Sequence, residues 1–156
     1  MSIRYYMSCK NCYEMHGRGF SVETGSCASL FHNDGSCNNW ISEFGTRAYR
    51  KQLRIFLKNN DKTLGFPIDY KIFGCLKCKR IYNYAVLEYK EKSIPFIFNF
   101  KCKCHRKLEE LQADIVDVDN DRFLKLYNRS HNEYPLICPD CNQIIEGKIT
   151  WEMYID

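Results

Sequence analysis

The sequence lacks a long apolar run. Its longest apolar stretch, residues 94–100, is interrupted by Pro95 and Asn99, and about 20 apolar residues are needed to cross a bilayer. The opening residues MSIRYYMSCK also lack the apolar stretch of a secretory signal peptide. We therefore expect a soluble, cytoplasmic protein, and in that reducing compartment close cysteine pairs are more often metal ligands than disulfides.

Diagnostic catalytic spacings are missing as well. No pair of histidine or carboxylate residues has the spacing of a known site, so we expect a protein that is not an enzyme and assign no catalytic residue. A zinc-supported nuclease or other hydrolase that uses His16, His32 or His131 stays open as an alternative. A dithiol redox protein is a second alternative, although the cysteine pairs lack the βαβ surroundings of such proteins.

Cysteine is abundant, with ten residues in the chain. Eight of them form four close pairs, three of the form Cys-x-x-Cys and one Cys-x-Cys. Such a pair wraps a tight turn around a metal and places both sulfurs about 2.3 Å from it. Four pairs supply the thiolates of two structural Cys₄ zinc sites. In chain order, the predicted ligands of two Zn²⁺ ions are Cys9 and Cys12, Cys75 and Cys78, Cys102 and Cys104, and Cys138 and Cys141.

Two ways of sharing the metals remain open. Either the first pair joins the second and the third joins the fourth, or the two middle pairs share one metal and the two outer pairs the other. Loop-closure entropy grows only logarithmically with length and barely separates them. We favour the first, because each site then closes its own ribbon. His105 is an alternative to Cys104, although structural sites favour thiolate. Asn142, after the fourth pair, suits a left-handed backbone.

The two remaining cysteines, Cys27 and Cys37, fall in a Ser-, Gly- and Asn-rich stretch that we expect to be a loop over residues 21–45. With His32 midway, and His16 or water as a fourth ligand, they are candidates for a third zinc site. The more ordinary interpretation is a pair of free thiols, because no standard spacing supports a third metal.

Residues 46–60 give the clearest helical pattern. Thr46 is a suitable N-cap, and Tyr49, Leu53, Phe56 and Leu57 recur on one face. The basic residues of this helix form either a solvated face or a candidate contact for nucleic acid or an acidic partner. They are Arg47, Arg50, Lys51, Arg54 and Lys58.

Short strands are expected beside the cysteine pairs, and a short helix over residues 105–114. We also expect helical spacing over residues 121–128 and a terminal hairpin over residues 144–154. The predicted fold class is therefore α+β: a small metal-stapled protein of two zinc-ribbon or knuckle units with short antiparallel hairpins and one inserted helix. The units are residues 1–90, with a loop and helix insertion at 21–69, and residues 91–156.

The formal net charge of +4 counts cysteine as neutral. Zinc binds thiolate, so two Zn²⁺ ions add four positive charges, eight thiolates remove eight, and the loaded chain is near zero. Lysines beside the cysteine pairs are then expected as counter-charges to thiolate. Overall charge therefore favours a protein partner slightly over nucleic acid, and we expect no membrane contact.

In six short motifs the chain resembles small bacterial multi-zinc-ribbon proteins that carry four spaced cysteine pairs. These motifs are Cys-Lys-Asn-Cys, Gly-Arg-Gly-Phe, Glu-Phe-Gly, Cys-Leu-Lys-Cys, Cys-Pro-Asp-Cys and a terminal strand with Trp151. The loop with Cys27 and Cys37 and the shortened third pair depart from that pattern. The resemblance implies a ribbon fold and zinc. Together these features predict a non-catalytic zinc-binding module that scaffolds a macromolecular interaction surface.

Overall fold

The computed structural model describes residues 2–12, 19–28, 45–60, 67–87 and 96–155. Eight antiparallel strands form one sheet in the order β7-β6-β5-β3-β2-β1-β8, with β4 paired to β3 outside this path. The eight strands hold about half of the described residues, and helix holds about one seventh. The α+β prediction is therefore wrong, because the strands beside the cysteine pairs join a common, curled sheet instead of forming two separate ribbons with short hairpins.

The strands are β1 (Ser2–Ser8), β2 (Gly19–Ala28), β3 (Pro67–Gly74), β4 (Ile81–Leu87), β5 (Glu109–Val118), β6 (Asp121–Tyr127), β7 (Glu133–Tyr134) and β8 (Ile149–Ile155). Helix α3 spans Arg47–Asn60, and residues 10–12 form one helical turn. Within the part of the chain that the structure describes, no helix is long and apolar enough to cross a membrane.

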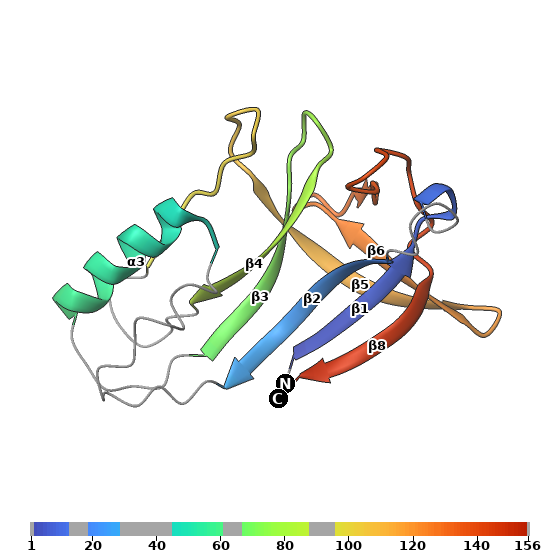
Figure 1. The fold of residues 1–156 in the computed structure, drawn as a ribbon, viewed down its shortest axis with the longest axis horizontal. Coiled ribbons are helices and arrows are strands. Elements are labelled where there is room, and N and C mark those ends of the chain that lie inside the picture. The colour runs from blue at the N-terminus through green and yellow to red at the C-terminus, as the bar shows by residue number, and fades with distance from the viewer. Residues whose placement is uncertain (1, 13–18, 29–44, 61–66, 88–95, 156) are drawn as a thin grey trace.

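Strand β3 is the branch point of the sheet. β4 pairs along it from Ile68 to Gly74. β2 pairs with its first half, where Gly25 lies opposite Tyr70, and β5 pairs with its last residues, 72–74. The two arms of the sheet separate here, one running through β2, β1 and β8 and the other through β5 and β6 (Figure 1). β8 pairs with β1, which brings the two chain ends together.

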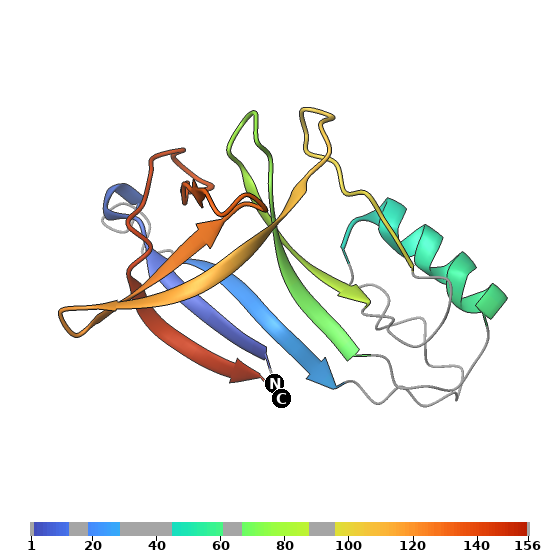
Figure 2. The ribbon, with the colours of Figure 1, turned by 180° about the vertical axis from the view of Figure 1, so that it is seen from behind.

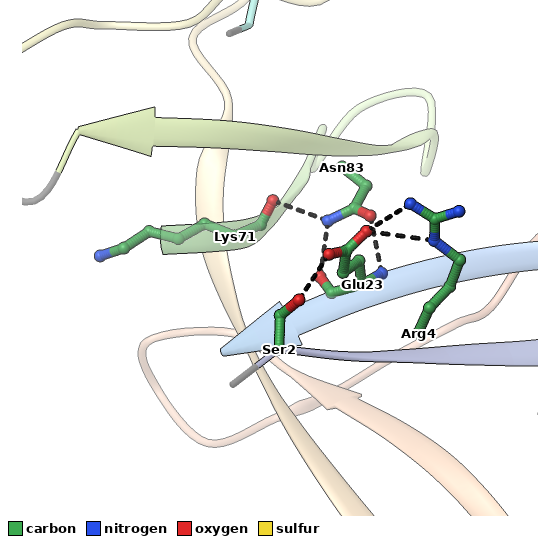
Figure 3. Close-up of polar contacts among 5 residues, drawn as sticks. All are labelled: Ser2, Arg4, Glu23, Lys71 and Asn83. Carbon is green, nitrogen blue, oxygen red and sulfur yellow. Dashed lines mark hydrogen bonds and ion pairs between the residues drawn. The ribbon is translucent and has the colours of Figure 1, made fainter. Parts of the chain in front are cut away.

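Asn83 on β4 fills the gap where β2 leaves β3 (Figure 3). Its side-chain oxygen accepts from the Glu23 N–H at 2.7 Å, and its nitrogen donates to the carbonyls of Glu23 and Lys71 at 2.8 and 3.2 Å. The Glu23 carboxylate, on a residue only 3% exposed, accepts from Ser2 at 2.6 Å and from Arg4 at 2.7 and 3.1 Å. One side-chain amide thus replaces a missing strand partner, and the buried charge is paired.

Each of two apolar cores contains cysteines from two distant pairs. The first core lies inside the curled sheet and includes Met7, Leu124 and Leu126, all fully buried, with Cys9, Cys12 and Cys138. The second lies between α3 and β4 and includes Leu53, Phe73 and Phe100 with Cys75 and Cys102. The cysteine groups are therefore continuous with the cores.

Helix α3 lies where the sequence predicts it. The Thr46 hydroxyl accepts from the Tyr49 N–H at 3.2 Å, which caps the first turn. Tyr49 and Leu53 are buried and Phe56 is half-buried, whereas the Leu57 side chain lies outside the described residues. The Tyr49 hydroxyl accepts from the Leu87 N–H at 2.8 Å, and burial raises the pKa of Tyr49 to about 12. This contact fixes the helix to the end of β4.

Several segments differ from the prediction. Residues 21–28 of the expected loop belong to β2, because Phe20 and Val22 alternate with polar neighbours and pack in the first core. The helices expected over residues 105–114 and 121–128 are instead largely the hairpin β5–β6, which turns at Asp119 and Asn120 with φ of 48° and 68°. Residues 96–100 form no strand. The expected terminal hairpin is absent, because β8 pairs with β1.

Candidate metal centres

The structure brings the eight predicted cysteines into two groups of four. Tetrad 1 comprises the outer pairs, Cys9, Cys12, Cys138 and Cys141, and tetrad 2 comprises the middle pairs, Cys75, Cys78, Cys102 and Cys104. Within each tetrad the four sulfur atoms lie within 4.8 Å of one another. The pairing that we favoured from the sequence is wrong, and the alternative is right.

Distances between sulfurs fit a tetrahedral metal site. Four sulfurs at about 2.3 Å from one zinc ion are separated by about 3.8 Å along each edge. In tetrad 1 Cys9 lies 3.6 Å from Cys141, and Cys12 lies 3.7 Å from Cys138. In tetrad 2 the distances are 3.5 Å for Cys75 to Cys104 and 3.2 Å for Cys78 to Cys102. All far exceed the 2.05 Å of a disulfide, and the eight thiols are free.

The backbone turns at the cysteine pairs are alike. In both Cys75–Arg80 and Cys138–Gln143, the N–H of the fifth residue donates to the carbonyl of the first, and the N–H of the first donates to the carbonyl of the sixth, at 2.8–3.0 Å. The Cys102 turn makes the same two bonds with one residue fewer. The His105 N–H donates to the Cys102 carbonyl, and the Cys102 N–H donates to the Arg106 carbonyl. The Cys-x-Cys pair is therefore a shortened form of the same turn, and it supplies Cys104, not His105, to the tetrad.

In each of these three turns, the residue after the second cysteine has a positive φ. Lys79, His105 and Asn142 have φ of 57°, 65° and 59°. This conformation lets the chain reverse after the second cysteine and turns successive backbone N–H groups toward the sulfurs. The prediction for Asn142 is confirmed. The other two lack the Asn or Gly that would have signalled the conformation in the sequence.

Tetrad 1 is assembled by the pairing of the first and last strands. Cys9 and Cys12 follow β1, and Cys138 and Cys141 precede β8, which is the neighbour of β1 in the sheet. The two segments meet on the right of Figure 1, above the end of β1 and the start of β8. Three of the four thiols are buried, so this site closes the end of the first core.

Tetrad 2 is assembled by two neighbouring loops, residues 75–80 between β3 and β4 and residues 101–107 before β5. Both loops project from the same end of the sheet in Figures 1 and 2. Tyr134 supports the first loop, since its buried hydroxyl donates to the Cys75 carbonyl at 2.8 Å. Gly74 leaves room for that ring, because a Cβ there would lie 2.7 Å from Tyr134.

Charge in tetrad 1 is divided unevenly among the thiols. Burial alone would raise the pKa of Cys9, but hydrogen bonds from the N–H groups of Cys12 and Asn11 and from Cys141 lower it to about 7. The pKa of Cys12 is raised well above its usual range by hydrogen bonding with Cys141 and by burial. A bound cation would allow all four thiols to ionise together.

Tetrad 2 has the same division. Burial would raise the pKa of Cys102, but the Cys104 N–H and the Tyr82 hydroxyl, 3.3 Å from the sulfur, lower it to about 6. Burial would also raise the pKa of Cys75, but hydrogen bonding, mainly from the Cys78 N–H, lowers it. Hydrogen bonding with Cys102 and Cys75 raises the pKa of Cys78 to about 12. Tyr82 and Tyr134 are supporting residues that the sequence analysis missed, and no spacing pattern marks them.

Other predicted site residues are placed as follows. His16, His32 and Cys37 lie outside the described residues, and of Cys27 only the backbone in β2 is described, so the third site stays a prediction. His131 is exposed in a turn after β6. On α3, Arg47, Lys51, Arg54 and Lys58 are exposed and Arg50 is half-buried, its side chain donating to the Gly45 carbonyl; their contact with a partner stays a prediction.

Each tetrad takes two ligands from either side of residue 90, and the division into two units there stays a prediction. The two tetrads are compatible with zinc-binding units, whereas the residues that the structure describes form no separate ribbons. No family model matches the chain, and no curated protein or solved structure matches it either.

Proposed function

We propose that the protein is a zinc-binding module in which each tetrad holds one structural Zn²⁺ ion and the metals fix a surface that binds another macromolecule. Four thiolates complete the coordination of zinc and leave no open position for substrate or water. The metals then contribute folding free energy instead of catalysis, and the resulting scaffold positions exposed side chains around the tetrads.

The observation that carries this proposal is the arrangement of eight sulfurs from four distant segments into two groups of four, each compact enough to surround one zinc ion. Backbone N–H groups two or three residues after Cys9, Cys75 and Cys102 donate to the sulfurs of these cysteines, and the Tyr82 hydroxyl donates to the Cys102 sulfur. These donors stabilise thiolate, as a metal site requires. Divalent metals that prefer oxygen ligands do not suit this donor set, whereas zinc does.

Zinc content of cysteine variants tests the proposal. The wild-type protein should hold two zinc ions, measured by native mass spectrometry and elemental analysis. Cys9→Ser and Cys138→Ser should each lose about one ion, and the double variant should lose no more, because both ligands belong to tetrad 1. A double variant of Cys9 and Cys102 should lose both ions, because it breaks both tetrads.

Cys27→Ser is the matched control, since Cys27 belongs to neither tetrad, and it should keep both ions. A wild-type chain without zinc, or with two ions that survive Cys9→Ser and Cys102→Ser, would contradict the proposal. Loss of a third ion from Cys27→Ser would establish the additional site expected as an alternative from the sequence.

A further inference from the structure

The near-zero charge of the zinc-loaded chain hides a strong local excess. The two loops of tetrad 2, residues 75–80 and 101–107, contain seven lysines and arginines and no carboxylate. A Zn(Cys)₄ centre there contributes −2, so the loops carry +5. The loops of tetrad 1, residues 9–12 and 138–142, carry only Lys10 and Asp140 beside the same −2. The positive charge is concentrated at one of the two centres.

These seven residues are all exposed, and none forms an ion pair with a residue that the structure describes. They are Lys77, Lys79, Arg80, Lys101, Lys103, Arg106 and Lys107. Two charges would suffice to balance a thiolate centre of −2, so five are in excess. Lys10, by contrast, pairs with Glu146 at 3.3 Å.

A cleft of about 250 Å³ opens between tetrad 2 and the Cys138 turn of tetrad 1. Arg80 and Lys103 line it from the two loops of tetrad 2, and Pro139 and Asn142 line it from the turn. The half-buried aromatic residue Tyr82 also lines the cleft. The cleft therefore combines cations from two loops with an aromatic surface, and both of its sides are held in place by cysteine tetrads.

We infer that this surface, Arg80, Tyr82 and Lys103 with the surrounding bases of tetrad 2, binds single-stranded nucleic acid. Lysine and arginine neutralise successive phosphates, and an aromatic ring stacks on an unpaired base, which a duplex does not offer. An acidic protein segment would use the cations but not the ring. The inference rests on the proposed function, because the zinc centres hold the loops together.

Fluorescence anisotropy with labelled 12-mers of single-stranded DNA and RNA tests the inference, with a duplex and an acidic peptide of equal charge for comparison. The two single strands should bind more tightly than the other probes. The logarithm of affinity should fall with the logarithm of salt with a slope of about −3 if four phosphates are neutralised.

Two pairs of variants locate the site. R80E/K103E should weaken binding at least tenfold. K51E/R54E makes the same charge change on the basic face of α3, which is the competing candidate surface, and should bind within twofold of the wild type if the tetrad 2 surface is the site. Tyr82→Leu should weaken binding several-fold, and Tyr82→Phe, which also loses the hydroxyl but keeps the ring, should not. Zinc content is measured for every variant.

Fewer than two zinc ions in the wild type would refute the proposed function and this inference with it. Two zinc ions without salt-dependent binding would refute the inference alone. Equal loss in both charge-reversal variants would overturn the assigned surface, and tighter binding of the acidic peptide than of either single strand would replace nucleic acid by a protein partner.

Discussion

Replacing Asn83 by alanine should destabilise the protein by about 2–4 kcal/mol, because each buried backbone group left without a partner costs about 1–3 kcal/mol. The N–H and carbonyl of Glu23 face away from β1 and are both satisfied by this one side chain, at 2.7 and 2.8 Å. No strand replaces it, because β2 begins its pairing with β3 only at Gly25. The weaker bond to the Lys71 carbonyl, at 3.2 Å, adds little.

The measurement is urea unfolding of the zinc-loaded protein at a fixed, buffered concentration of free zinc, since metal release otherwise enters the transition. Asn83→Asp should be at least as damaging as Asn83→Ala, because a carboxylate keeps the acceptor, loses the donor and adds a charge beside Glu23. Asn99→Ala, at an exposed position, is the control and should change stability by less than about 0.5 kcal/mol. A similarly small loss in Asn83→Ala would show that the branch point needs no side-chain partner.

Two further predictions concern the tetrads. Because the pKa of Cys12 is raised and that of Cys78 is raised to about 12, both thiols are protonated at neutral pH without metal. Zinc must therefore displace protons, and its affinity at each site should rise at least tenfold per pH unit between pH 6 and 8. Calorimetry in buffers of different ionisation enthalpy counts the protons that are released. A zinc affinity independent of pH would contradict this prediction. Gly74→Ala places a Cβ 2.7 Å from the Tyr134 ring. This overpacking should lower the free energy of unfolding by about 1–3 kcal/mol. A melting temperature equal to that of the wild type at saturating zinc would show instead that the ring moves aside freely.

Local patterns in the sequence were sufficient for the ligands and for several elements. Eight thiols at short spacing predict the two tetrads whatever fold carries them, and Thr46 with the apolar face of α3 predicts the helix. The alternation of Ile3, Tyr5 and Met7 predicts β1, in which Tyr5 and Met7 are buried. Each of these signals depends only on neighbours within a few residues. The predictions drawn from them are therefore correct although the predicted fold class is wrong.

The hairpin β5–β6 shows why other elements were misread. Its residues include Glu109, Glu110 and Gln112, which have good helix propensity, yet Leu111 is buried against β3 and Leu124 in the first core. Tertiary burial of alternate residues therefore overrode local preference. The adjacent Asp119 and Asn120 were the available sequence signal for a two-residue hairpin turn, because these residue types tolerate the positive φ that both positions have.

Which pairs share a metal could not be read from loop lengths. The rejected arrangement closes loops of 66 residues, from Cys9 to Cys75, and 36 residues, from Cys102 to Cys138. The observed one closes loops of 24–29 and 126–132 residues, and the difference in closure entropy is only about 0.3 kcal/mol. The sheet decides the outcome: six paired positions between β1 and β8 hold the first and last cysteine pairs together. Tetrad 1 thus acts on chain ends that strand pairing has already joined, and the metal and the sheet stabilise the same long-range contact.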